Sequence, residues 1–176
     1  MTGGATSLFW SPRRRRLWLC VGLAAAAWSV LNGLVWWRET HALLINATDS
    51  LPHWAFLLEK KRPASVGDLI FFRPPPSELL LTHFGEGEQV FGKHVLGVGG
   101  DVVTVAGRAV LINGRQVAVA KTTSKRGVPL EVVAPQTIPF DCFFVGTDHP
   151  DGFDSRYAAI GIICRDRVLG TARPIL

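Results

Sequence analysis

The chain has few of the residues that mark metal, redox or nucleic-acid-binding proteins. Its 176 residues include three cysteines, and no two of them have CxxC spacing. No group of His, Cys and carboxylate residues has metal-ligand spacing, so we expect no metal and no cofactor. The formal net charge is +5, but four of the positive charges are the consecutive arginines 13–16. The other charges are scattered, which disfavours nucleic-acid binding.

Charged side chains are absent from residues 17–37, which read LWLCVGLAAAAWSVLNGLVWW. A helix needs about 20 such residues to cross the hydrocarbon core of a bilayer. A cleavable secretory signal is the alternative, but its apolar region usually has about 7–15 residues. A small-x-small exit before Arg38 is also lacking. We therefore predict a retained transmembrane anchor at residues 17–37.

The arginines at 13–16 predict the orientation of this anchor. Positive charge next to a span is typical of the cytoplasmic side of a membrane. We therefore expect a cytoplasmic basic tail at residues 1–16 and an extracytoplasmic domain at residues 38–176.

Beyond the anchor, the pattern is that of an all-β domain. Short apolar runs alternate with turn residues, and the expected strands are residues 68–72, 93–98, 101–105, 109–112, 116–120, 130–133 and 142–145. Asn113-Gly114 is a dipeptide favoured in two-residue hairpins, where both positions need positive φ. Cys142 and Cys164 are left as either a disulfide or two buried thiols, because their spacing selects neither.

A serine hydrolase needs a base beside its hydroxyl and donors for the oxyanion. The chain has no GxSxG elbow, so spacing gives a Ser/His/Asp triad no support, although there are five histidines. A lysine can act as the base where burial lowers its pKa.

Four ordered blocks carry a resemblance to a known family. They are the apolar anchor, ThrAspSerLeuPro at 48–52, GlyAspLeuIlePhePhe at 67–72 with GlyLysHisValLeuGlyValGlyGlyAspValVal at 92–103, and GlyThrAspHisPro to PheAspSerArgTyr at 146–157. In this order the chain resembles type I signal peptidases, and more closely the TraF-type peptidases of conjugative transfer systems. The resemblance implies a signal-peptidase-like, mainly antiparallel β domain with one N-terminal transmembrane helix.

The resemblance also implies the catalytic residues. Ser50 matches the family's nucleophile, and Lys93 matches the lysine that acts as its general base. Thr48, with the backbone N–H of Ser50, matches the oxyanion hole.

The last block matches supporting positions around the active site. Asp154 and Arg156 match an AspSerArg pattern whose ion pair supports the site, and Ser155 lies between them. A serine that helps to orient the lysine often precedes this pattern, and Gly152 and Phe153 stand there instead. Ser155 or a backbone carbonyl is the expected substitute.

The function expected from the resemblance is that of a serine endopeptidase in a bacterial inner membrane. Its catalytic domain would be periplasmic and would cut membrane-bound, prepilin-like precursors close to the bilayer, for pilus assembly and conjugal transfer. A housekeeping signal peptidase and a catalytically inactive pilus or secretion assembly factor are the alternatives. Simple hydrolysis and rejoining of the product by an internal amine both stay open.

Overall fold

The computed structural model describes residues 12–45 and 53–175. The chain divides into two compact units, Met1–Thr40 and His41–Leu176. In chain order the elements are α1 (Pro12–Thr40), β1 (His41–Ile45), β2 (Ala55–Glu59), β3 (Leu69–Phe72), α2 (Glu78–Phe84), β4 (Phe91–Val98), β5 (Val102–Ala106), β6 (Ala109–Ile112), β7 (Arg115–Val119), β8 (Gln136–Thr137), β9 (Cys142–Gly146), β10 (Ile163–Cys164), η1 (Arg165–Arg167) and β11 (Val168–Pro174).

Helix α1 makes up the described part of the first unit. Its 29 residues extend beyond the predicted span of 17–37 at both ends. At 1.5 Å per residue it is about 43 Å long, and the hydrocarbon core of a bilayer is about 30 Å thick. Its apolar window has a mean hydropathy of 1.7, and none of that window is buried. The helix is therefore long and apolar enough to cross a membrane.

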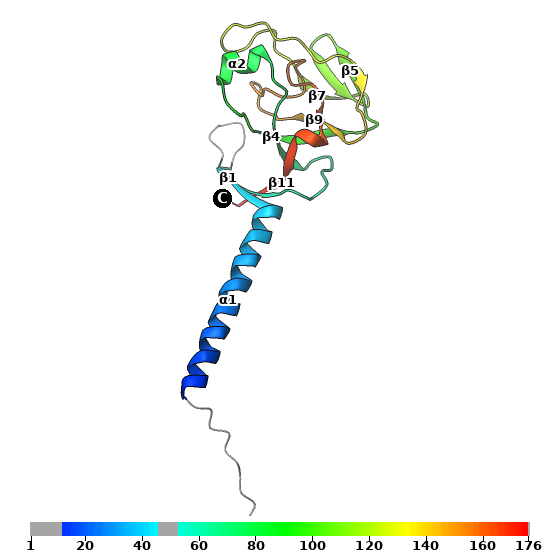
Figure 1. The fold of residues 1–176 in the computed structure, drawn as a ribbon. Coiled ribbons are helices and arrows are strands. Elements are labelled where there is room, and N and C mark those ends of the chain that lie inside the picture. The colour runs from blue at the N-terminus through cyan, green and yellow to red at the C-terminus, as the bar shows by residue number, and fades with distance from the viewer. Residues whose placement is uncertain (1–11, 46–52, 176) are drawn as a thin grey trace, which may run out of the picture. The chain divides into compact units, whose positions relative to one another are not determined.

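The second unit is built from two antiparallel sheets (Figure 1). One sheet has seven strands in the order β1-β2-β11-β3-β4-β9-β10, and the other has four in the order β7-β6-β5-β8. The C-terminal strand β11 lies between β2 and β3 and is antiparallel to both. The predicted fold class, mainly antiparallel β with one N-terminal apolar helix, is confirmed.

Strand β9 joins the two largest hydrophobic clusters of the core. All five of its residues are buried. Because side chains alternate between the faces of a strand, Phe143 and Val145 pack in one cluster with β3 and β4. Cys142 and Phe144 pack in the other cluster with β5 and β6. Strand β9 therefore contributes side chains to the hydrophobic packing of both sheets.

The predicted hairpin at Asn113-Gly114 is confirmed. Ile112 pairs with Arg115, which leaves a loop of these two residues. Asn113 has φ 51° and Gly114 has φ 79°, as a two-residue turn that matches strand twist requires.

Other elements differ from the sequence prediction. The strand expected at residues 130–133 is wrong, because only the isolated bridge between Val132 and Tyr157 forms there. The sequence did not predict helix α2, nor the strands β1, β2, β8, β10 and β11. The expected extracytoplasmic domain from residue 38 begins with the last turn of α1, which is helical to Thr40, and then forms β1.

The structure decides between the two states left open for Cys142 and Cys164. They form a disulfide, and they are paired neighbours on β9 and β10. The bridge therefore fastens the edge strand β10 to β9. Cys20 is an exposed free thiol on α1.

Candidate active site

Strand β4 places Lys93 inside the protein. Phe91, Lys93 and Val95 alternate along the strand and share a face; Lys93 is only 5% exposed. On the adjacent strand β3 its partner is Ile70, which is fully buried. The aliphatic stem of Lys93 is therefore packed between apolar neighbours.

The amine of Lys93 is held in an environment that disfavours its charge. Among the described residues it forms no hydrogen bond or ion pair. Burial lowers the pKa of Lys93 below its ordinary value of 10.5, the negative charge of Asp154 opposes this shift, and the positive charge of Arg156 adds to it. Lys93 is thus predisposed to lose its proton and accept another, which is the property of a general base.

The lowered pKa of Lys93 predicts that the stability of the β domain depends on pH. At pH values below the folded-state pKa of Lys93, the side chain is a buried ammonium, and its destabilisation of the folded chain is at its maximum. Between that pKa and 10.5, the folded chain has lost the proton that the unfolded chain retains, so the free energy of unfolding rises with pH. The rise approaches about 1.4 kcal/mol per pH unit, and it should be absent in Lys93→Met. Urea unfolding in detergent between about pH 7 and about pH 10 measures it. Parallel curves for both proteins would contradict the prediction.

Asp154 and Arg156 form a buried ion pair beside the end of β9. Arg156 Nε lies 2.7 Å from Asp154 Oδ1, and Arg156 Nη2 lies 2.8 Å from Asp154 Oδ2. Asp154 is fully buried and Arg156 is 4% exposed. Burial acts to lower the pKa of Arg156, but the hydrogen bond and charge of Asp154 outweigh it and leave the pKa raised. Arg156 therefore stays charged.

This pair also fixes the backbone of Thr147. The Thr147 N–H donates to Asp154 Oδ2 at 3.2 Å, and the Thr147 carbonyl accepts from Arg156 Nη2 at 2.7 Å. In the pairing of β4 with β9, His94 lies opposite Gly146. Gly146 is the last residue of β9 that pairs with β4, so the ion pair holds the chain at the point where this pairing ends.

Ser155 is tied to β9. Its hydroxyl oxygen accepts from the Val145 N–H at 3.0 Å, and its own N–H donates to the Val145 carbonyl at 3.0 Å. Ser155 is fully buried. It is therefore placed to fix the segment that carries Asp154 and Arg156.

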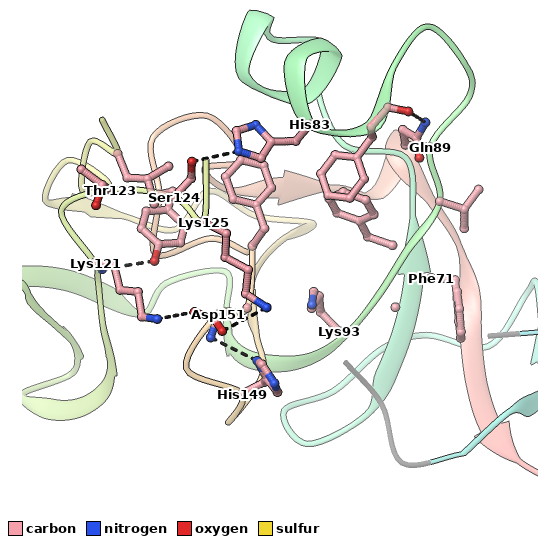
Figure 2. A pocket seen from close by; sticks show the side chains of 18 of the residues that line it. Phe71, His83, Gln89, Lys93, Lys121, Thr123, Ser124, Lys125, His149 and Asp151 are labelled. Carbon is pink, nitrogen blue, oxygen red and sulfur yellow. Dashed lines mark hydrogen bonds and ion pairs between the residues drawn. The ribbon is translucent and has the colours of Figure 1, made fainter. Parts of the chain in front are cut away.

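A cavity of about 860 Å³ opens beside Lys93. Figure 2 shows Lys93 among its lining residues, with Lys121, Lys125, Asp151 and His149 gathered to one side. Asp151 Oδ2 lies 3.3 Å from Lys125 Nζ, and its other oxygen pairs with Lys121. The hydrogen bonds of these two ammonium groups hold the pKa of the Asp151 carboxyl below its ordinary value. The site therefore joins a buried amine to a cavity large enough for part of a polypeptide.

A comparison with protein families shows which family the chain belongs to. The family described as "Signal peptidase, peptidase S26" matches residues 14–176. The chain belongs to the signal peptidase family. This membership makes it a serine peptidase that processes precursor proteins at a membrane, and α1 is its candidate anchor.

Two curated relatives support this assignment. A protein named "Probable conjugal transfer protein TraF", from Sinorhizobium fredii, is 26% identical over 94% of this chain and 93% of its own length. A "Signal peptidase I" from Leptolyngbya laminosa is 32% identical over 62% of this chain and 51% of its own. Among solved structures, a signal peptidase I from Enterococcus faecalis matches with 21% identity and a TM-score of 0.38, over 62% of this chain and 97% of that one.

The signal peptidase residues expected from the sequence are only partly visible. Thr48 and Ser50 lie outside the described residues. The other four predicted residues, Lys93, Asp154, Ser155 and Arg156, are buried and lie on β4 or on the segment after β9. Within residues 12–45 and 53–175 no three His, Cys, Asp or Glu side chains are grouped to hold a metal.

Most of the residues that line the cavity were not predicted from the sequence. Lys121 and Lys125 have no motif, and Phe84 lies on a helix that was not predicted. His149 and Asp151 stood within the last signal-peptidase block, but that block was interpreted only through its AspSerArg end. In the sequence they lie between the predicted strand at residues 142–145 and the AspSerArg motif, and this position was the signal that could have found them.

The packing around Gly152 explains why a serine is absent there. A Cβ on Gly152 would lie 2.3 Å from Thr147 Cγ2 and 3.0 Å from both Asp154 Oδ2 and the His149 carbonyl oxygen. Thr147 is branched at Cβ, and its side chain is stiff. The threonine therefore fills the space that a side chain at 152 would need.

Gly152→Ser is accordingly expected to destabilise the β domain by about 1–3 kcal/mol, the usual effect of overpacking a close-packed site. Urea unfolding measures the loss. Thr147→Ser removes Cγ2, so the double variant Thr147→Ser/Gly152→Ser should recover most of it. Full stability of Gly152→Ser alone would show that Thr147 does not occupy this space.

Proposed function

We propose that the protein is a membrane-anchored serine endopeptidase in which Ser50 is the nucleophile and Lys93 is the general base. The observation that carries this proposal is the buried amine of Lys93, with its lowered pKa, at the edge of the cavity. A lysine in water is protonated at neutral pH and cannot accept a proton. A lysine desolvated as Lys93 is can do so.

In the proposed reaction, Ser50 Oγ attacks the scissile carbonyl carbon and Lys93 Nζ accepts the hydroxyl proton. The C–N bond of the substrate then breaks, and the Lys93 ammonium gives that proton to the leaving amine. Water attacks the resulting ester on Ser50 while Lys93 accepts one of its protons and passes it to Ser50 Oγ. Thr48 and the Ser50 N–H would stabilise the oxyanion in both steps.

The proposed substrate is an exported, membrane-bound precursor of prepilin type, matured for pilus assembly and conjugal transfer. This part is supported by the TraF relative, whose similarity extends over nearly the whole of both chains. The conjugal role printed in that protein's name suggests the class of precursor. The proposed location is the inner membrane of a bacterium, with residues 1–16 in the cytoplasm and the β domain in the periplasm.

Two observations support a periplasmic β domain, and a third supports a surface that contacts lipid. The arginines at 13–16 precede α1, which favours a cytoplasmic N-terminus, and the Cys142–Cys164 disulfide suits an oxidising compartment. Leu43, Ile45 and Trp54 are large, apolar and exposed. Leu43 and Ile45 lie on β1, which begins at the residue after α1, and Trp54 lies just before β2.

Mass spectrometry of a candidate pilin co-expressed with this chain tests the proposal. We expect a shorter pilin with the parent chain and an uncut pilin with Ser50→Ala. The mass of the product also separates hydrolysis from rejoining, because a rejoined product lacks one water. An uncut pilin in both cultures, with both chains folded in the membrane, would refute pilin maturation.

A housekeeping signal peptidase is the second candidate, favoured by the 32% identity with the signal peptidase I of Leptolyngbya laminosa. Deletion of the gene separates the two functions. General export of secreted proteins should fail only for a housekeeping enzyme, whereas loss of pili alone indicates the specialised one.

A further inference from the structure

The cavity beside Lys93 has an aromatic wall that the proposed reaction does not use. We define this aromatic wall as Phe84, Phe91, Phe153 and Tyr157, all of which line the cavity. The ring centroids of Phe84 and Phe91 are 5.2 Å apart, and those of Phe153 and Tyr157 are 5.7 Å apart. Phe153 also lies 6.3 Å from Phe84 and 6.5 Å from Phe91. These separations are those of interacting rings, so the four form one continuous surface.

Part of this surface is open to solvent. Phe84 is 44% exposed, although its ring is large and apolar. Phe91 and Phe153 are half-buried, and Tyr157 is buried behind them. When another apolar group covers an apolar ring that is exposed to water, the free energy of the system falls. The exposed part of the aromatic wall is therefore suited to an apolar group that enters the cavity.

The helix that carries Phe84 is fixed in place. His83 Nδ1 lies 2.9 Å from the Leu79 carbonyl oxygen, and His83 Nε2 lies 2.9 Å from Ser124 Oγ. Because a carbonyl only accepts, Nδ1 carries a hydrogen and donates it to Leu79. Arg126 donates a further hydrogen bond to the Thr82 carbonyl. The cavity wall is thus braced before a ligand arrives, as recognition pockets usually are.

Three charged groups of the cavity, Lys121, Lys125 and Asp151, are already paired with each other. Asp151 binds both Lys121 and Lys125, and its N–H donates to His149 Nδ1 at 3.1 Å. An acidic occupant would have to compete with Asp151 for these ammonium groups. An uncharged aromatic occupant would not.

We propose that the aromatic wall binds an aromatic side chain of the precursor, near the bond that is cut. This inference rests on the proposed function, because the cavity is a substrate site only if Lys93 acts on a peptide. The cavity, at about 860 Å³, lies within the range of pockets that hold ligands of several residues' size. A methyl group alone would leave most of the wall uncovered.

Cleavage of a synthetic alanine-rich reporter peptide tests this inference. A single phenylalanine is moved through the positions on both sides of the cut, and kcat/KM is measured with the full chain in detergent. At one position we expect phenylalanine to raise kcat/KM by about tenfold to hundredfold over alanine, the usual discrimination of an apolar pocket. Phe84→Ala should bring that ratio close to one, and Phe84→Leu should restore part of it.

Leu81→Ala is the matched control. Leu81 lies on the same helix and is exposed, but it does not line the cavity. The phenylalanine preference should survive in Leu81→Ala. A preference that survives in Phe84→Ala, or the lack of any preference, would overturn the inference.

Binding of the same peptides to Ser50→Ala separates this inference from the proposed function. Suppose that the parent chain cleaves no peptide, but Ser50→Ala binds the phenylalanine peptide more tightly than the alanine peptide. If adding Phe84→Ala abolishes this difference in affinity, the aromatic site stands and the proposed function fails. If the peptides are cleaved and bind with equal affinity, the proposed function stands and the aromatic site is wrong.

Discussion

Lys93→Met is expected to reduce precursor cleavage by at least about a thousandfold while the β domain stays folded. Methionine keeps the length and the apolar stem of lysine but has no basic nitrogen. Without a base, the serine hydroxyl is a poor nucleophile at neutral pH, and general base catalysis alone contributes about 10²–10⁴-fold. The variant loses a buried amine with no hydrogen-bond partner among the described residues, so its stability should not fall. Cleavage of precursor by the purified chain in detergent measures the effect.

His94→Gln is the matched control for this result. His94 is the next residue on β4, but it is exposed and its Nδ1 lies 3.2 Å from the Gly67 carbonyl oxygen. We expect it to keep nearly full activity, whereas Ser50→Ala should be as inactive as Lys93→Met. If Lys93→Met and Ser50→Ala both cleave the precursor, the Ser/Lys dyad is wrong.

Arg156→Met should have the largest effect on stability. It leaves the carboxylate of Asp154 fully buried without its partner, and removing one member of a buried pair typically costs about 3–5 kcal/mol. The variant also loses the hydrogen bond to the Thr147 carbonyl. In addition, activity should shift to higher pH, because the positive charge that helps to lower the pKa of Lys93 is gone. Urea unfolding and a pH profile of cleavage measure the two effects.

The double variant Asp154→Leu/Arg156→Met provides the control. Replacing both charges by apolar groups removes the unpaired carboxylate, so it should be more stable than Arg156→Met alone. A loss below about 1 kcal/mol in Arg156→Met would mean that the pair behaves as a surface salt bridge.

Elements with local signals could be predicted from the sequence. The hairpin at Asn113-Gly114 depends on two residues that tolerate positive φ, and this is a property of the dipeptide itself. The predicted strand at residues 93–98 lies within β4. Residues 130–133 contain the same large apolar residues, two valines and one leucine, but there only Val132 pairs, through a single bridge to Tyr157. A strand needs a neighbour, and the sequence does not say which segments receive one.

The elements that were missed depend on distant contacts. Strand β11 is inserted between β2 and β3, and even its nearest pair, Val168 with Phe72, is 96 residues apart in the chain. Nothing near β11 in the sequence marks its place. The candidate site shows the same limit. Lys93 was found through its motif, but the filling of the space over Gly152 by Thr147 is a tertiary contact.

The ion pair of Asp154 and Arg156 also closes a loop. Both of its members bind Thr147, so the segment from 147 to 156 starts and ends at the same place. A loop fastened at its base can change at its tip without moving the strands that hold it. The tip of this loop, around His149 and Pro150, can therefore be lengthened or exchanged by engineering. Because His149 and Asp151 line the cavity, such changes would alter its lining while the sheet that carries Lys93 stays as it is.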